Sequence, residues 1–241
     1  MTTIAAELAT PALLVPQGAE ERAIRRAAPN ATVIATRAGV HAATLPEELP
    51  TGLIIVMGLC GALPTATAPT PTAVSPLCHP EHVEGQPQDL RTGNIAIFRD
   101  VVDEVGLYAF DNELVQAMQA TLPSAKLVHG CTIDHVVTRA TERAALAAAY
   151  GAQAVDMEGT HVARALAARG CPSLIVRVVS DDPSFDLPPI EGAFTADGTI
   201  RPLHLARAFA SRPVAAARFI RDVRRSLTVL GEVAAAITRR S

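Results

Sequence analysis

The sequence of 241 residues lacks tryptophan and contains only two tyrosines. Proteins that bind single-stranded nucleic acid stack bases on aromatic side chains, so this scarcity argues against such a function. A surplus of positive charge is also missing, because 21 basic residues face 24 acidic ones, a net charge of −3 at pH 7. General nucleic-acid binding usually requires a basic face and a high pI, and it is therefore disfavoured.

Long apolar runs are absent as well. None approaches the roughly 18 to 20 residues needed to span a bilayer, and the N-terminus lacks the basic segment that opens a signal peptide. The cysteines are far apart and form no CxxC pair, whereas disulfide frameworks are typical of small secreted domains. These absences predict a soluble cytoplasmic protein. The four cysteines are Cys60, Cys78, Cys131 and Cys171.

Apolar, β-rich runs alternate with helical patterns along the chain, and 49% of the residues are apolar, enough for a large core. Such alternation predicts an α/β protein, a single domain over 1–241 with a mostly parallel central sheet flanked by helices. The predicted strands cover 12–16, 32–36, 53–57, 95–98, 126–129, 153–155 and 173–179. The predicted helices cover 19–28, 142–151, about 157–169, and about 203–238 with a break near Pro213.

One segment, at about 64–91, breaks this alternation. Prolines recur through it, and proline removes backbone donors, so the segment is predicted to be an insertion outside the sheet. It contains Cys78, His79 and His82, which could bind a metal or could simply belong to a polar insertion. Because no partner cluster lies elsewhere, we expect no metal site, and no organic cofactor is implied.

Carboxylates follow three of the predicted buried strands. In open α/β sheets, ligands bind beyond the carboxyl ends of the strands, so these acids could line one crevice. Paired carboxylates suit cleavage of a glycosidic bond, which needs an acid for the leaving group and a base for the nucleophile. Each acid also has an ordinary explanation, as a complement to a helix dipole or as turn chemistry. The acids are Glu20, Glu21, Asp156, Glu158, Asp181 and Asp182.

Residues 154–181, AVDMEGTHVARALAARGCPSLIVRVVSD, resemble the signature of the nucleoside phosphorylase and nucleosidase superfamily. The shared pattern is a strand, Met-Glu at a helix start, a Gly-x-Pro turn, a buried strand with Arg, and Ser-Asp. The segment 53–63 resembles the glycine-rich turn of this family, and 13–24 resembles its N-terminal strand–Gly–Glu segment. The resemblance implies a phosphorylase-like fold and cleavage of a nucleoside.

The resemblance also implies catalytic roles. Asp181 matches the aspartate that protonates, or hydrogen-bonds at, N7 of the leaving purine. Glu20 matches the glutamate that activates water in the nucleosidases, and Glu21 remains the alternative because the register is uncertain by one residue.

Further residues match substrate-binding positions of the family. Glu158 matches the glutamate that binds the ribose 2′- and 3′-hydroxyls, and Met157 matches the methionine that packs on the sugar. Ser180 would orient the catalytic aspartate, Gly58 lies in the glycine-rich turn, and Ile133 would touch the base.

Departures from the family pattern favour water over phosphate as the nucleophile. Val56 and Leu59 stand where purine phosphorylases carry Arg and Ser. The backbone N–H groups of Gly18, Gly58 and Gly61 remain as anion donors, and Arg37 could join them, although an ordinary surface arginine is the preferred interpretation of Arg37. We therefore expect a hydrolytic nucleosidase of the methylthioadenosine/S-adenosylhomocysteine type. The alternatives are a phosphate-dependent phosphorylase, including the hopanoid-associated type, and a non-catalytic nucleoside-binding protein. The expected partners are a small nucleoside and further copies of the chain, as a dimer or a trimer of dimers.

Overall fold

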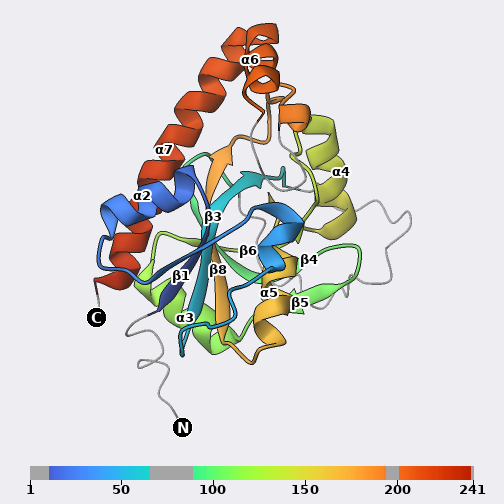
Figure 1. The fold of residues 1–241 in the computed structure, drawn as a ribbon. Helices are drawn as coiled ribbons and strands as arrows, with labels where there is room; N and C mark the ends of the chain where they lie inside the picture. Colours follow the sequence, from blue (N-terminus) through green and yellow to red (C-terminus); the bar gives the residue numbers. More distant parts are fainter. Residues whose placement is uncertain (1–10, 66–88, 194–200, 240–241) are drawn as a thin grey trace.

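The computed structural model describes residues 11–65, 89–193 and 201–239 (Figure 1). Its strands are β1 (Ala12–Pro16), β2 (Val33–Thr36), β3 (Ile54–Ala62), β4 (Ile95–Val102), β5 (Leu107–Ala109), β6 (Lys126–Thr132), β7 (Ala154–Asp156) and β8 (Ser173–Asp181). Its helices are α2 (Ala19–Ala27), α3 (Asn112–Thr121), α4 (Ala140–Tyr150), α5 (Gly159–Ala167), α6 (Pro202–Ser211) and α7 (Pro213–Thr238), with 3₁₀ turns η1 (Gly39–Ala43) and η3 (Glu191–Ala193). Every predicted strand and helix is present, whereas β5 and α3 were not predicted.

The strands form one mixed sheet, which confirms the predicted α/β class. Parallel pairs join β1 to β2 and β3, β3 to β8, and β6 to β4 and β7. Antiparallel pairs join β3 to β7, and β4 to β5 and β8. The pairings β3–β8–β4–β6–β7–β3 close a ring of five strands. Because β1, β3 and β8 run parallel, their carboxyl ends meet at one edge, where ligands bind in related sheets.

The hydrophobic core lies between the sheet and helices on both of its sides. All residues of β1 and β8 are buried, as expected for strands covered on both faces. Helix α7 packs against α2, β3 and β8, and α5 packs on the other side (Figure 1). Where α7 crosses α2, a Cβ on Gly231 would lie 2.9 Å from Ala27 Cβ and 3.1 Å from the Ala23 carbonyl oxygen. This close crossing therefore requires glycine at position 231.

Several predicted strands end too early, and for two of them the difference affects the site. Residues 53–63 do not form a strand followed by a glycine turn, because β3 continues through Gly58 and Gly61. Strand β8 likewise extends through Ser180 and Asp181, which therefore do not belong to a turn. The glycines of β3 lie against side chains of β8, and the polar end of β8 contacts α4 through Asp181 and Arg143. Both strands therefore continue into the site.

The predicted insertion at 64–91 leaves and rejoins the described structure at neighbouring points. The hydroxyl of Thr65 donates a hydrogen bond to Asp89 Oδ1 at 2.7 Å. Leu90 follows directly and is buried in the core. The residues on the two sides of 66–88 are therefore held together by a side-chain hydrogen bond.

The metal-site candidates Cys78, His79 and His82 lie outside the described residues. Among the described residues, no cluster of three His, Cys, Asp or Glu side chains could hold a metal ion. None of the described helices is both long and apolar enough to cross a membrane.

Replacing residues 66–88 by a short Gly/Ser link is expected to leave the thermal midpoint within a few degrees. The two ends already meet, and loop-closure entropy changes only with the logarithm of loop length. Thermal unfolding followed by circular dichroism measures the effect. Adding Leu90→Ser to the shortened chain is the control, and it should lower the midpoint by several degrees because a core side chain is lost. A large loss of stability in the shortened chain alone would contradict the prediction.

Candidate active site

One end of the site forms where α2, β3 and β8 meet. Glu20, in the first turn of α2, accepts a hydrogen bond at Oε1 from the backbone N–H of Leu59 at 2.7 Å. A Cβ on the neighbouring Gly58 would lie 2.3 Å from Arg177 Nη1 and 3.0 Å from Glu20 Oε1. Only glycine leaves room for the guanidinium and the carboxylate to approach the same point of β3.

Arg177 is fully buried in the middle of β8 and holds two carboxylates. Its Nε and Nη2 donate to Asp156 Oδ2 at 3.0 and 2.6 Å, and Nη2 lies 3.9 Å from Glu158 Oε2. Within the described structure its Nη1 has no hydrogen-bond partner. A buried donor left unpaired costs about 1–3 kcal/mol. This nitrogen, beside Gly58 and Glu20, is therefore placed to bind an acceptor atom of a ligand.

The ends of β6 and α5 fix the carboxylates in turn. The Thr132 hydroxyl and the Gly159 N–H donate to Asp156 Oδ1 at 2.8 and 3.0 Å. Helix α5 begins at Gly159, two residues later than predicted, so that Glu158 occupies its N-cap position. The carboxylate of Glu158 accepts the N–H of Met157 at 3.0 Å. These bonds hold both acids beside the buried guanidinium.

The shared cation leaves this cluster with excess negative charge. Burial raises the pKa of Glu158 to about 7; Arg177 lowers it, while Asp156 and Glu20 raise it further. Burial also raises the pKa of Glu20, against the opposing effects of the Leu59 N–H and of Arg177. Three carboxylates thus share one guanidinium, and Glu158 exchanges its proton near neutral pH.

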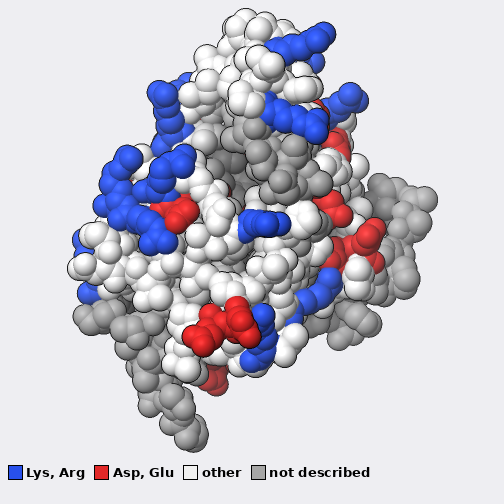
Figure 2. Space-filling view, in the orientation of Figure 1, with Lys and Arg blue, Asp and Glu red and all other residues white. Residues whose placement is uncertain are grey.

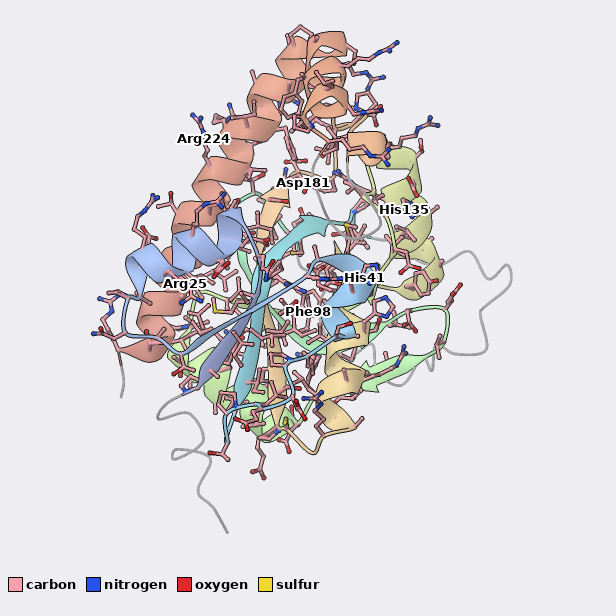
Figure 3. All side chains as sticks on the ribbon, viewed as in Figure 1. Arg25, His41, Phe98, His135, Asp181 and Arg224 are labelled. Carbon is pink, nitrogen blue, oxygen red and sulfur yellow. The ribbon has the colours of Figure 1, made fainter. Side chains whose placement is uncertain are left out.

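The other end of the site lies at the end of β8, where Figure 3 labels Asp181. Its Oδ1 lies 2.6 Å from the Ser180 hydroxyl, which also lies 3.1 Å from the Cys60 carbonyl oxygen. Its Oδ2 lies 2.9 Å from Arg143 Nη2, and both side chains are almost wholly buried. The N–H direction misses this oxygen, so within the described residues Oδ2 has a charge partner but no hydrogen-bond donor.

Arg143 reaches this point from α4 and is anchored to the backbone. Its Nε and Nη2 donate to the Val137 carbonyl at 3.3 and 3.1 Å, and its Nη1 donates to the Asp182 carbonyl at 2.9 Å. Burial raises the pKa of Asp181, although Arg143 and the Ser180 hydroxyl lower it. The pKa of Asp181 thus reflects two opposing effects, burial, which raises it, and the fixed positive charge of Arg143, which lowers it.

The two ends are connected along β8. Arg177 and Asp181 are four residues apart, about 13 Å at the usual rise of a strand. Gly58 pairs with Arg177 and Gly61 with Asp181, and the register shifts by one residue between them, so Ser180 is the extra residue of a bulge. Bulges re-aim side chains and are frequent beside active sites. We treat the two clusters as the ends of one candidate site.

The structure separates the two candidate bases. Glu20 enters the cluster, whereas Glu21 turns to the surface and pairs with Arg25 at 2.8 Å. Met157 is partly exposed, and Ile133 packs at the edge of a second hydrophobic cluster. Their contacts with a sugar and a base stay predictions.

Arg177, Arg143 and Thr132 belong to the site, although the sequence reasoning gave them no role. The signal for Arg177 was available, because a charge within the apolar run 173–179 must be buried and a buried charge needs partners. Arg143 carries no such signal, since an arginine on an alanine-rich helix is ordinarily exposed. Thr132 is equally inconspicuous at the end of a strand.

Comparison with known families adds the decisive observation. The family model of the phosphorylase superfamily matches residues 7–196, a range that includes both ends of the site. The chain belongs to the phosphorylase superfamily. This membership confirms the resemblance, and with it the prediction of an N-glycosyl hydrolase or nucleoside phosphorylase.

Solved structures share the fold of this phosphorylase-superfamily protein at low sequence identity. The methylthioadenosine/S-adenosylhomocysteine nucleosidase of Helicobacter pylori is 13% identical with a TM-score of 0.63, covering 97% of this chain and 99% of its own. The futalosine hydrolase of the same organism is 13% identical with a TM-score of 0.64, over 97% and 99%. A Streptococcus pneumoniae nucleosidase in complex with 8-aminoadenine is 15% identical with a TM-score of 0.54, over 92% and 99%. Comparison with curated proteins finds no match.

Glu158→Gln is expected to flatten the pH dependence of stability of this phosphorylase-superfamily protein. The pKa of Glu158 is about 7 in the folded state against 4.5 ordinarily, so the folded state holds this proton more tightly. Stability is therefore lost as the pH rises through this window, by about 3 kcal/mol for this group. Urea unfolding at pH 5 and pH 8 measures the slope, with Glu21→Gln as the control, because this partly exposed glutamate lies outside the Arg177 cluster. Equal slopes for wild type and Glu158→Gln would contradict the prediction.

Proposed function

We propose that this protein hydrolyses the N-glycosidic bond of a purine nucleoside. One observation carries the proposal: Arg177 Nη1, a buried donor with no hydrogen-bond partner among the described residues, and Glu20 Oε1 lie on the same side of Gly58, 2.3 and 3.0 Å from the position that a Cβ there would take. A donor and a carboxylate oxygen this close to each other can hold a water molecule between them, through a lone pair and one hydrogen of the water. This is the arrangement that general-base activation of water requires.

Glu20 is the proposed base. As the C1′–N9 bond breaks, the sugar gains oxocarbenium character, the water oxygen bonds to C1′, and the water proton passes to Glu20. Burial raises the pKa of Glu20 toward the neutral range, and a general base works best when its pKa lies near the working pH. Glu158 would accept the ribose 2′- and 3′-hydroxyls through charge-assisted hydrogen bonds, with Met157 beside the sugar.

Asp181 is the proposed acid at the other end. Its Oδ2, which accepts no hydrogen bond from the described residues, would give a proton to N7 of the purine while the electrons of the C1′–N9 bond pass to the leaving base. Ser180 holds the other carboxylate oxygen, and the raised pKa of Asp181 favours the protonated form that this step needs. Ile133 would lie beside the base.

Charge favours hydrolysis over phosphorolysis. A phosphate dianion at the Arg177 cluster would meet three carboxylates and one guanidinium, and an unpaired buried anion is very costly. Val56 is a buried apolar residue, and the N–H of Leu59 is already used by a carboxylate. Arg37 is exposed to solvent. Water, which is neutral, is the better fit.

The fold relatives guide the choice of substrate. They include nucleosidases of methylthioadenosine and S-adenosylhomocysteine and a futalosine hydrolase, and one of them holds an adenine analogue. We take methylthioadenosine as the first substrate to test. A single domain over 1–241, a cytoplasmic location and a homo-oligomer, either a dimer or a trimer of dimers, complete the proposal.

Asp181→Asn is expected to lower kcat for methylthioadenosine by roughly a hundredfold or more, the usual scale for loss of a general acid. Steady-state release of adenine measures it, and the thermal midpoint checks folding. Asp182→Asn is the matched control, because that neighbour is partly exposed and pairs with Arg91 at 3.3 Å. Its kcat should stay within a few-fold of wild type. Wild-type turnover in Asp181→Asn would remove this residue from the mechanism.

The nucleophile is decided by incubating the protein with nucleosides in phosphate-free buffer and then adding phosphate. Base release is expected without phosphate, at a rate that added phosphate does not raise, with a free ribose sugar as the second product. Sugar 1-phosphate as the main product, formed at a rate that saturates with phosphate, would instead support the phosphorylase alternative, including the hopanoid-associated type. No base release at all, with binding retained, would support a non-catalytic nucleoside-binding protein.

A further inference from the structure

We propose that the outer side of α6 and α7, together with the adjoining side of α2, docks on an anionic membrane surface. This proposal is independent of the proposed function. We call this surface the arginine face. It comprises Arg22, Arg26, Leu203, Arg207, Val214, Arg218, Arg224 and Arg225.

Positive charge is concentrated at this end of the chain. Residues 201–239 contain eight arginines and two carboxylates, a net of +6, whereas the whole chain has a net charge of −3. Figure 2 shows basic side chains gathered over α2 and α7 and around α6. Six of the eight arginines form no ion pair with any described residue: Arg201, Arg207, Arg218, Arg224, Arg225 and Arg239.

The helical spacing puts these cations on common faces with apolar side chains. In α7, Val214, Arg218 and Arg225 follow the i, i+4, i+11 positions of one helix face. In α6, Leu203 and Arg207 are four residues apart and share a face in the same way. Each helix thus presents an apolar residue and at least one cation together.

The apolar members are unusually exposed. Leu203 is 84% exposed and Val214 76% exposed, one near each end of α6. Phe185, itself 48% exposed, lies beneath Arg218, whose guanidinium is 4.0 Å from the ring centre. Basic helices with exposed apolar side chains bind at the boundary between lipid headgroups and acyl chains. Nucleic acid would satisfy the arginines and leave these apolar side chains in water, so a membrane is the better partner.

A groove between α2 and α7 extends the arginine face. It has a volume of about 530 Å³, and Arg22, Arg26 and Arg224 line it together with Glu232. None of the three arginines is ion-paired with a described residue. A guanidinium group can donate two hydrogen bonds to two oxygens of one phosphate. The phosphate of a phospholipid headgroup therefore matches the lining of the groove.

Sedimentation of the full chain with vesicles tests the proposal. We expect binding to phosphatidylcholine vesicles that contain phosphatidylglycerol, no binding to pure phosphatidylcholine, and weakening by salt. Each basic residue near an anionic leaflet strengthens binding by about fivefold, so Arg207→Gln, Arg218→Gln and Arg225→Gln together should weaken it about a hundredfold. Leu203→Ser with Val214→Ser should weaken it several-fold without any change of charge.

Matched controls separate the arginine face from general charge and apolarity. Arg91→Gln, Lys126→Gln and Arg169→Gln remove the same charge elsewhere, and Val105→Ser with Leu107→Ser removes exposed apolar side chains from the β4–β5 hairpin. Both controls should bind the anionic vesicles nearly as the wild type does. Thermal midpoints verify that each variant folds.

Three results would overturn the proposal. The first is no binding to anionic vesicles, and the second is equal weakening by the two arginine triples. The third is tighter binding to a DNA or RNA oligonucleotide that Leu203→Ser with Val214→Ser leaves unchanged, which would identify a nucleic-acid surface. If the arginine triple fails to fold, Arg207→Gln alone should still weaken vesicle binding about fivefold, and an unchanged affinity would count against the proposal.

Discussion

The buried guanidinium of Arg177 is the charge on which the rest of the candidate site depends. Removing a cation from water costs several kcal/mol, and only close partners offset this cost. Asp156 supplies two hydrogen bonds, and Glu158 and Glu20 add negative charge nearby. Burial alone would lower the pKa of Arg177, but these acids raise it, so the cation is permanent. Each acid of the cluster therefore ionises in the field of one fixed positive charge.

That arrangement constrains the backbone of β3. A side chain at Gly58 would occupy the place of the guanidinium, and a Cβ at Gly61 would lie 3.1 Å from Val155 Cγ1 and in contact with Asp181 Oδ2 at 3.4 Å. Glycine normally weakens a strand, because it adds backbone entropy and packs no side chain. Here the lost strand propensity is offset by pairing with β8 from Ile54 to Gly61, in a strand that is mostly buried. Glycine at position 58 is tolerated because hydrogen bonds to β8 hold the residues of β3 on both sides of it.

Much of the fold could be predicted from the sequence, because alternation and apolar runs are local signals. The glycine turn was mispredicted for a physical reason: the group that needs the space at Gly58 is Arg177, which belongs to another strand. Arg143 could not be found, since its role depends on a carboxyl that only the tertiary fold brings to it. The choice between Glu20 and Glu21 was equally open, because both occupy the first turn of one helix and only the packing of α2 on β3 separates them.

The segment that follows β8 connects the site to the arginine face, and Arg143 anchors the start of this segment. The chain after β8 passes from Asp182 beneath the α6–α7 corner, where Phe185 contacts Arg218. A displacement of α7 on a surface would act on this segment through that contact, and on β8 itself through the Ser226 hydroxyl, which donates to the Val179 carbonyl at 2.7 Å. Arg143 donates to the Asp182 carbonyl at its start and, through two further nitrogens, to the Val137 carbonyl on a separate segment. These bonds fix the backbone directly beyond the proposed catalytic acid, so movement of the segment around Phe185 is resisted at Asp182 before it reaches the carboxyl.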